Sequence, residues 1–300
     1  MRRILTVALA LFIGTTPAIA QERELIGTGR LFTNDYFGDK DDRWRSGSFV
    51  YSHVRGFGPY SGTEAMGDIL EFRFRSEIIA PDAGTPAPGD RPYVGVTSLG
   101  AHTHFQYGTA EVSLGVDVQA IGPQTGLSDF QNDFHDAFDM PNAPHTDQQL
   151  EDRFFLNGTA SATWRYDLGE SVQFRPFAEG LAGSEDLLRV GADFVVGPFG
   201  QDRLLLRDVV TGQLYSGTSK TAVGPSYVIG ADIASVFDSD FLPAERGYDV
   251  VETRGRARAG MHWQFGNRAS VFYGATYLSP EFEGQPEGQV VGSLKLNFNF

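Results

Sequence analysis

The chain has 300 residues, no cysteine and a formal net charge of −14 at pH 7. The absence of cysteine excludes disulfides, a thiol nucleophile and thiolate metal sites. The negative charge makes nucleic acid a poor partner, because cationic side chains must neutralise its phosphates. An acidic protein can still hold an anionic lipid when a divalent cation bridges the two.

The first twenty residues, 1–20, have the pattern of a secretory signal peptide. Two arginines precede an apolar run from Ile4 to about Gly14, and the segment ends in Ala-Ile-Ala. This pattern predicts cleavage after Ala20. The run is too short to span a bilayer, and no other stretch approaches the ~20 apolar residues that a transmembrane helix needs. No linker or internal repeat divides residues 21–300, so we expect one domain there.

Alternation with a period of two residues dominates this domain and predicts β-strands. In Leu70–Ile78, for example, apolar residues occupy one face and charged residues the other. The predicted strands are 23–36, 46–56, 68–80, 92–106, 108–121, 151–167, 171–185, 188–198, 225–238, 252–265, 268–280 and 289–300. Residues 199–224 are the weak part of this count, because they could form a hairpin extension, a long connection or a further strand.

A transmembrane antiparallel β-barrel explains these strands better than a soluble β-sandwich. Rows of charged residues interrupted by glycine lie opposite large aromatic residues, as in the strand 252–265. A membrane barrel places such apolar rows toward lipid and the polar rows in its lumen, in strands of about ten residues. The even count of twelve strands also fits a single-chain bacterial barrel. The sequence therefore predicts an all-β, exported outer-membrane protein.

Three long polar connections are expected to meet at the cell-surface rim of this barrel. With both termini in the periplasm, the connections after the first, third and fifth strands lie outside. They contain "TNDYFGDKDDRWRSGS", "APDAGTPAPGDRPY" and "IGPQTGLSDFQNDFHDAFDMPNAPHTDQQ". Together they supply carboxylate, carboxamide, hydroxyl and imidazole groups, the set used to hydrolyse an ester. The candidate residues are Asn34, Asp35, Ser46, Gln131 and His135.

A short helix is predicted from Ser128 to Asp139 in the third of these connections. Ser128 is a plausible N-cap, and no proline or glycine interrupts the segment. Gln131 and His135 are four residues apart and therefore share one face. The alternative is an amphipathic helix that is anchored by Phe130, Phe134 and Phe138 and leaves His135 exposed.

Other polar groups give weaker signals. His102 and His104 share a strand face at a spacing seen in metal sites, but no third ligand is near in sequence, so we expect them to line the lumen. Asp39, Asp41 and Asp42 could bind a hard cation, although they lack the order of an EF-hand loop. The chain has no Gly-x-Ser-x-Gly elbow, so a classical α/β hydrolase is not expected.

The sequence resembles the outer-membrane lipid A 3′-O-deacylase family (LpxR). The matching stretches are "NDYFGDKDDRWRSGS", "GDRPYVG", "VQAIGPQTGLSDFQNDFHDAF", "DQQLEDRF" and "YLSPEFEG", in this order over nearly the whole mature chain. The resemblance implies a twelve-stranded barrel with a short helix on an outer loop. It also implies calcium-dependent hydrolysis of the 3′ ester of lipid A at the outer leaflet, which releases an acyloxyacyl group.

The resemblance also implies roles for individual residues. His135 would be the general base that activates water, with Gln131 orienting the imidazole or the substrate. Asn34 and Asp35 match the pair that lines the family's site, and Asp35 would be the calcium-side carboxylate. Ser46 falls where the family commonly has threonine.

The second connection departs from the family pattern. The family has a lysine in this connection. In this chain the connection contains no lysine, and its one cationic residue is Arg91. Arg91 is expected to bind a phosphate of lipid A, or the chain acts on a different lipid. The expected partners are lipid A or lipopolysaccharide and the outer membrane, and the expected state is a monomer.

Two other functions remain open at the level of sequence. The chain could be a non-catalytic barrel, either a small channel or a structural protein. It could also be a serine-dependent outer-membrane phospholipase, which would need Ser46 or another serine paired with His135. A water nucleophile is preferred, because no second base is evident near Ser46.

Overall fold

A computed structural model describes residues 22–83, 89–139, 146–218, 223–266 and 269–298. Within them, twelve strands close into one antiparallel barrel, as predicted. The predicted signal peptide and residues 299–300 lie outside the described residues. The strands of the barrel are β1 (Glu24–Asn34), β2 (Trp44–Gly56), β3 (Ile69–Ala80), β4 (Val94–Tyr107), β5 (Ala110–Ile121), β6 (Arg153–Trp164), β8 (Val172–Ala182), β9 (Glu185–Val196), β12 (Gly224–Ser239), β13 (Thr253–Phe265), β14 (Ala269–Leu278) and β15 (Gln289–Phe298).

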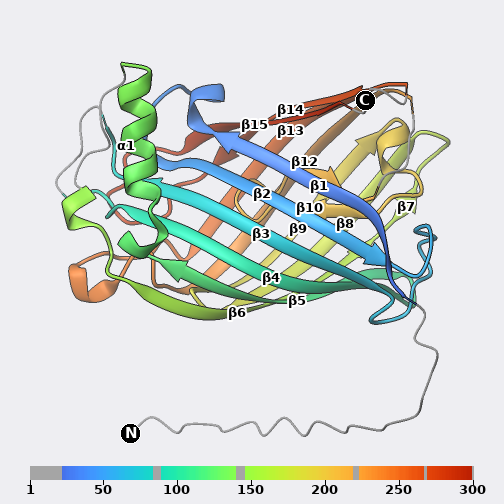
Figure 1. Cartoon of the computed structure of the whole chain (residues 1–300), viewed down its shortest axis with the longest axis horizontal. Helices are drawn as coiled ribbons and strands as arrows, with labels where there is room; N and C mark the ends of the chain where they lie inside the picture. Colours follow the sequence, from blue (N-terminus) through green and yellow to red (C-terminus); the bar gives the residue numbers. More distant parts are fainter. Residues whose placement is uncertain (1–21, 84–88, 140–145, 219–222, 267–268, 299–300) are drawn as a thin grey trace, which may run out of the picture.

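Each strand pairs with its neighbours along the chain, and the ends of the sheet meet between β1 and β15 (Figure 1). That closing seam places Phe32 opposite Leu294. The two-residue strand β7 (Tyr166–Asp167) pairs only with β8 and extends the sheet locally. Because closure leaves no long free edge, the sheet satisfies the backbone groups that lipid cannot.

Along the strands, apolar side chains point outward and polar side chains point into the lumen, as in a membrane barrel. On β12, Tyr227, Ile229, Ile233 and Phe237 are exposed on the outside, whereas Ser226 and Asp232 are buried in the lumen. Aromatic residues also mark both ends of the outer wall. Phe154, Phe237 and Tyr277 lie near one end, and Tyr107, Tyr166, Trp263 and Phe265 lie near the other. Such aromatic girdles border the apolar band of outer-membrane barrels.

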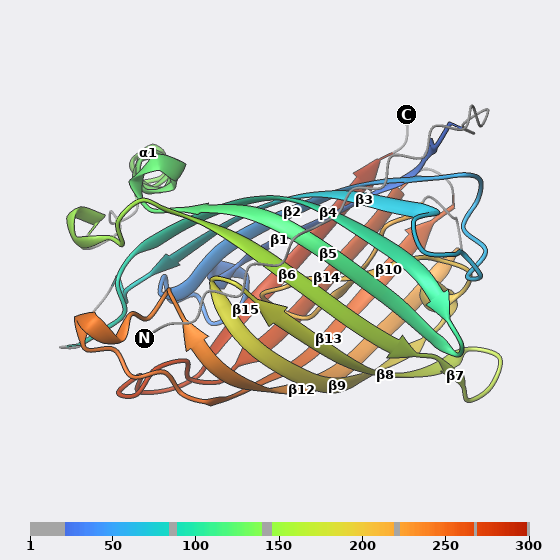
Figure 2. The ribbon, with the colours of Figure 1, turned by 90° about the horizontal axis from the view of Figure 1, so that it is seen from below.

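The long connections predicted for the outer rim meet at one end of the barrel. This end carries η1 (Asp35–Phe37), η2 (Pro123–Thr125), α1 (Leu127–Ala137), η3 (Thr146–Gln148) and η5 (Ala244–Arg246) (Figures 1 and 2). No helix in the described parts of the chain is long and apolar enough to cross a membrane. We call this end the outer end, since long loops lie outside and short turns face the periplasm in such barrels.

Part of the chain after β9, residues 205–216, lies in the lumen. After η4 (Pro198–Gly200), it forms a hairpin of β10 (Leu205–Arg207) and β11 (Leu214–Ser216), a separate sheet of two strands. Leu206 and Tyr215 of this hairpin join an apolar cluster with wall residues that include Val54 and Phe272. The hairpin does not span the membrane, so the count of twelve strands is unchanged.

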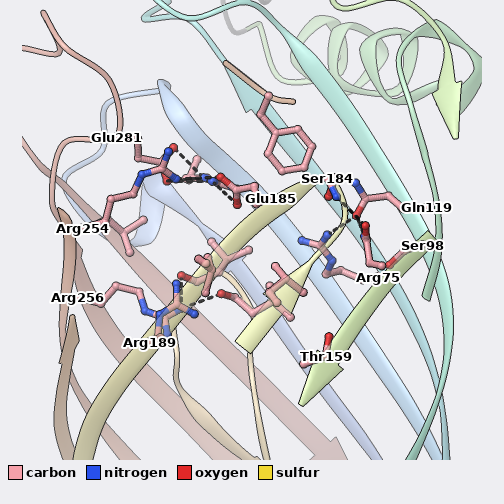
Figure 3. Close-up of a pocket in the computed structure, with 18 of the residues that line it drawn as sticks. Arg75, Ser98, Gln119, Thr159, Ser184, Glu185, Arg189, Arg254, Arg256 and Glu281 are labelled. Atoms are coloured by element: carbon pink, nitrogen blue, oxygen red, sulfur yellow. Dashed lines mark hydrogen bonds and ion pairs between the residues drawn. The ribbon is translucent and has the colours of Figure 1, made fainter. Parts of the chain in front are cut away.

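Charged pairs hold the hairpin against the barrel wall. Arg207 of the hairpin donates to Asp193 at 2.8 Å, and Arg258 donates to the same carboxylate at 2.7 Å. The wall residue Arg256 donates to the carbonyl of Val209 at 2.7 Å. A cavity of about 80 Å³ lies beyond the hairpin tip, and Figure 3 shows the polar side chains around it. The hairpin and these pairs therefore occupy part of the described lumen.

Candidate active site at the outer rim

Asn34 holds together the connection between β1 and β2. Its side-chain oxygen accepts a hydrogen bond from the backbone N–H of Tyr36 at 3.0 Å, which caps η1. Its side-chain amide donates to the carbonyl of Ser46 at 2.9 Å. The cap follows from the sequence, because asparagine is a strong N-cap residue. Asn34 thereby places Asp35 next to the start of β2, where Ser46 lies.

Asp35 is a buried carboxylate. Its residue is 3% exposed, and its Oδ2 accepts a hydrogen bond from the backbone N–H of Arg43 at 3.0 Å. Burial, together with the negative charge of Asp42, raises the pKa of Asp35 to about 8. A carboxyl group in this state binds a proton or a cation at neutral pH, because an isolated buried charge is unfavourable.

The helix α1 supplies Gln131 and His135. It begins after Gly126, which adopts a left-handed conformation (φ 68°) as the N-cap, so the prediction that Ser128 caps the helix is wrong. Ser128 lies inside the first turn and is buried. Glycine takes the cap here because it accepts positive φ at no steric cost. Gln131 and His135 both face inward and are 6% and 5% exposed.

The phenylalanines of α1 point away from the barrel. Phe130, Phe134 and Phe138 are 62%, 49% and 64% exposed. The alternative interpretation, in which they anchor the helix and His135 is exposed, is therefore wrong. The helix buries its polar face and exposes its apolar face.

Asp42 connects the helix to the β1–β2 connection. Its Oδ2 lies 3.5 Å from Nε2 of His135, and its Oδ1 lies 3.5 Å from the Nε2 donor of Gln131. The backbone carbonyl of Asp42 accepts a hydrogen bond from Ala83 at 2.9 Å. In the sequence, Asp42 is one of three aspartates in an acidic run. Its contact with His135 crosses 93 positions of the chain, so no local pattern could have revealed it.

Several buried polar atoms near these residues have no hydrogen-bond partner among the described residues. They are Ser46 Oγ, Gln131 Oε1, Tyr93 Oη and Gln149 Oε1. Tyr93 precedes β4, and Gln149 donates weakly from its amide to Ser128 of α1 at 3.4 Å. Unpaired buried polar atoms are rare in folded proteins and call for an explanation. A bound substrate, ion or water would satisfy them.

Arg91, the residue expected to bind a phosphate of lipid A, is buried and paired with a carboxylate. It is 1% exposed, and its Nη1 donates to Glu281 Oε2 at 2.5 Å. Arg45 donates to the same carboxylate at 2.9 Å and to Glu77 at 2.6 Å. The structure does not place Arg91 in contact with His135, Gln131 or Asp35, whereas it brings those three together around Asp42.

The residues at the rim suit a hard cation by their chemistry. The described residues contain no ready group of three or more His, Asp or Glu side chains at metal-binding positions. They do offer the desolvated carboxylate of Asp35 and the unpaired hydroxyl of Ser46. Calcium prefers oxygen ligands of these kinds and completes its shell with carbonyls and water. The carboxylate of Asp35 and the hydroxyl of Ser46 are therefore oxygen donors of the kind that a calcium ion accepts.

His102 and His104 lie in the lumen and belong to another network. His104 Nε2 is 2.8 Å from Glu71, and His102 Nε2 is 3.2 Å from Asp117. Each imidazole therefore has its own carboxylate partner on the barrel wall. Their placement agrees with the expectation that they line the lumen.

Comparison with known proteins identifies the family. A family model described as "Outer membrane protein LpxR" matches residues 5–300. The chain belongs to the LpxR family. Membership in this family and the barrel fold place the protein in the bacterial outer membrane. No curated protein matches the sequence significantly.

A solved LpxR structure shares the fold of this chain. LpxR from Salmonella typhimurium superposes with a TM-score of 0.74 at 17% identity, over 91% of this chain and 100% of that chain. The β domain of the Bordetella autotransporter BrkA gives a TM-score of 0.46 at 11% identity, over 91% of this chain and 99% of that chain. The first similarity shows the fold, and the second is too low to carry an argument.

Proposed function

We propose that this LpxR-family protein is a calcium-dependent lipid A 3′-O-deacylase, with His135 as the general base. The observation that carries the proposal is the buried pair of His135 and Gln131 beside Asp42, within a barrel of the LpxR family. The substrate class follows from the family, and the reaction class follows from the rim residues. The site lies at the outer end, where the acyl esters of an outer-leaflet lipid are found.

The tautomer of His135 would decide which of its ring nitrogens acts as the base. With Nε2–H directed at Asp42, the neutral imidazole has its basic lone pair on Nδ1. Nδ1 would take a proton from water as the water oxygen adds to the ester carbonyl. When the tetrahedral intermediate collapses, the imidazolium would return this proton to the departing sugar oxygen. The products are a free carboxylic acid and the sugar hydroxyl.

Asp35 and Ser46 would hold the calcium ion. A bound calcium would polarise the ester carbonyl and stabilise the negative charge that develops on its oxygen. Asn34 would contribute by fixing both residues, through its bonds to Tyr36 N and Ser46 O. Gln131 would hold the other carboxylate oxygen of Asp42, Oδ1, while His135 lies beside Oδ2.

The two alternatives have less support. A channel requires an open lumen, whereas the hairpin formed by β10 and β11 and its ion pairs occupy the described lumen. A serine-dependent phospholipase requires a base at Ser46, whereas Ser46 Oγ has no hydrogen-bond partner among the described residues. Water activated by His135 therefore remains the preferred nucleophile.

Mass spectrometry of lipid A tests the proposal directly. The protein and its His135→Ala variant would be expressed in the outer membrane of cells whose lipid A carries a 3′ acyloxyacyl group. We expect a mass loss equal to that group with the wild type and none with the variant, because a general base contributes about 10²- to 10⁴-fold. Unchanged lipid A with a correctly inserted wild-type barrel would refute the proposed function. A covalent acyl-enzyme lost in Ser46→Ala would instead establish the phospholipase mechanism.

A further inference from the structure

The helix α1 lies across the outer end of the barrel. Figure 1 shows α1 from the side, with its axis running across the direction in which the barrel is elongated, and Figure 2 shows it nearly end-on. In Figure 2 it sits outside the barrel wall. Because strands of a membrane barrel run between the two membrane faces, a helix in this position lies roughly parallel to the membrane plane.

The exposed side of α1 carries a stripe of phenylalanines. Phe130, Phe134 and Phe138 are spaced by four residues and so lie on one face. The rings of Phe134 and Phe138 are 4.7 Å apart, and all three side chains are about half exposed or more. Exposed apolar surface of this extent usually marks an interaction site.

The polar and apolar faces of α1 are oriented opposite to those of a surface helix on a soluble protein. A soluble surface helix turns its apolar face to the core and its polar face to water. Here Ser128, Gln131 and His135 face the barrel, and the phenylalanines face away from it. The arrangement is stable only if something apolar covers the stripe.

The position of the stripe indicates what covers it. Tyr36 and Phe37 of η1 are also exposed at the outer end, and Phe154 and Phe237 belong to the aromatic girdle there. The helix packs against β4 and η2, so the stripe lies beside strands whose outer faces carry the exposed residues Leu99 and Val118. Helices that lie in a membrane interface bury a face rich in Trp, Phe and Leu by ~5–10 Å at the boundary of headgroups and acyl chains.

We propose that α1 is a membrane-docking helix whose phenylalanine stripe inserts among the acyl chains of outer-leaflet lipids. Asp129, Asp133 and Asp136 lie on its other exposed side and remain in the headgroup region or in water, which limits how deeply the helix enters. The docked helix holds its buried face, with Gln131 and His135, at the depth of the lipid esters. The inference needs only the outer-membrane location and does not depend on hydrolysis.

Site-directed spin labelling tests the docking without any activity measurement. The chain has no cysteine, so a single introduced cysteine takes a nitroxide label specifically. Full-length mature protein in vesicles would carry the label at Phe134→Cys or, separately, at Phe130→Cys. Asp133→Cys on the same helix is the matched control, and Phe237→Cys on the wall is the membrane-embedded reference. Collision rates with oxygen, which concentrates in the bilayer, and with a water-soluble nickel chelate report the depth of each label.

We expect the labels at positions 130 and 134 to collide several-fold more with oxygen than with the chelate, like the label at position 237. The label at position 133 should show the opposite preference. Equal access of the chelate to positions 133, 130 and 134 would overturn the proposal. Dipolar broadening between labels at position 134 on two copies would also overturn it, because a second copy would then cover the stripe. Inactive protein with membrane-buried labels would refute the proposed function and leave the docking intact.

Discussion

At the scale of single residues, Asp42 has the largest consequence for the proposed mechanism. It contacts both His135 and Gln131, and its charge also acts on Asp35. We expect Asp42→Asn to lower kcat for lipid A by about 10- to 100-fold, less than the loss of the base itself. The physical reason is that the imidazole loses the carboxylate that orients it.

Calcium titration separates this role from metal binding. If Asp42 orients His135, saturating calcium will not restore kcat in Asp42→Asn. Full recovery at high calcium would show that Asp42 is an ion ligand and would contradict the orienting role. Asp41→Asn is the control, because the Asp41 side chain is 60% exposed and pairs with Arg43.

The raised pKa of Asp35 predicts how calcium affinity depends on pH. The folded protein keeps this carboxyl protonated below about pH 8, so calcium must displace the proton. The apparent affinity should therefore rise by up to about tenfold per pH unit between pH 6 and 8 and level off above that. Calorimetry in buffers of different ionisation heat measures the released proton. Proton release that persists in Asp35→Asn would assign the titration to another group.

At the scale of elements, the hairpin formed by β10 and β11 packs closely against the barrel wall at Gly29 of β1. A Cβ at Gly29 would lie 2.8 Å from the Tyr215 ring and 3.0 Å from the Ser216 carbonyl oxygen. We expect Gly29→Val to displace the hairpin at a cost of about 1–3 kcal/mol and to raise ion conductance in planar bilayers. Gly158→Val is the control, because nothing lies within 4 Å of its added Cβ. Equal conductance in the wild type and Gly29→Val would mean that the hairpin does not block ion flow.

At the scale of the whole molecule, the lipid-facing wall sets the stability of the barrel in the membrane. Ile233 is exposed on β12, between the girdle residue Phe237 and Tyr227 nearer the other end of the strand. We expect Ile233→Arg to lower the free energy of unfolding from lipid vesicles by about 2–4 kcal/mol, because the bilayer midplane cannot solvate the charge. Tyr166→Arg, near the periplasmic girdle, should cost no more than about 1 kcal/mol. Equal costs would mean that Ile233 does not lie at the midplane.

The sequence by itself determined the barrel. A period of two residues is a local property of each strand. The alternation of polar and aromatic residues can therefore be recognised in one segment without knowing which strand lies beside it. The helix with Gln131 and His135 on one face also followed from local spacing. The family resemblance drew on motifs spread along the chain, and both the fold and the family are confirmed.

Only the tertiary structure decided which groups meet. The apolar residues of 199–224 suit a strand, a loop or a hairpin equally. The packing of Tyr215 against Gly29 is what places the hairpin of β10 and β11 in the lumen. The contact of Asp42 with His135 and the pairing of Arg91 with Glu281 join residues far apart in the chain. The direction in which α1 turns its phenylalanines was likewise undecided, because periodicity identifies the faces of a helix but not which face the barrel covers. These features depend on barrel closure, which brings distant segments together.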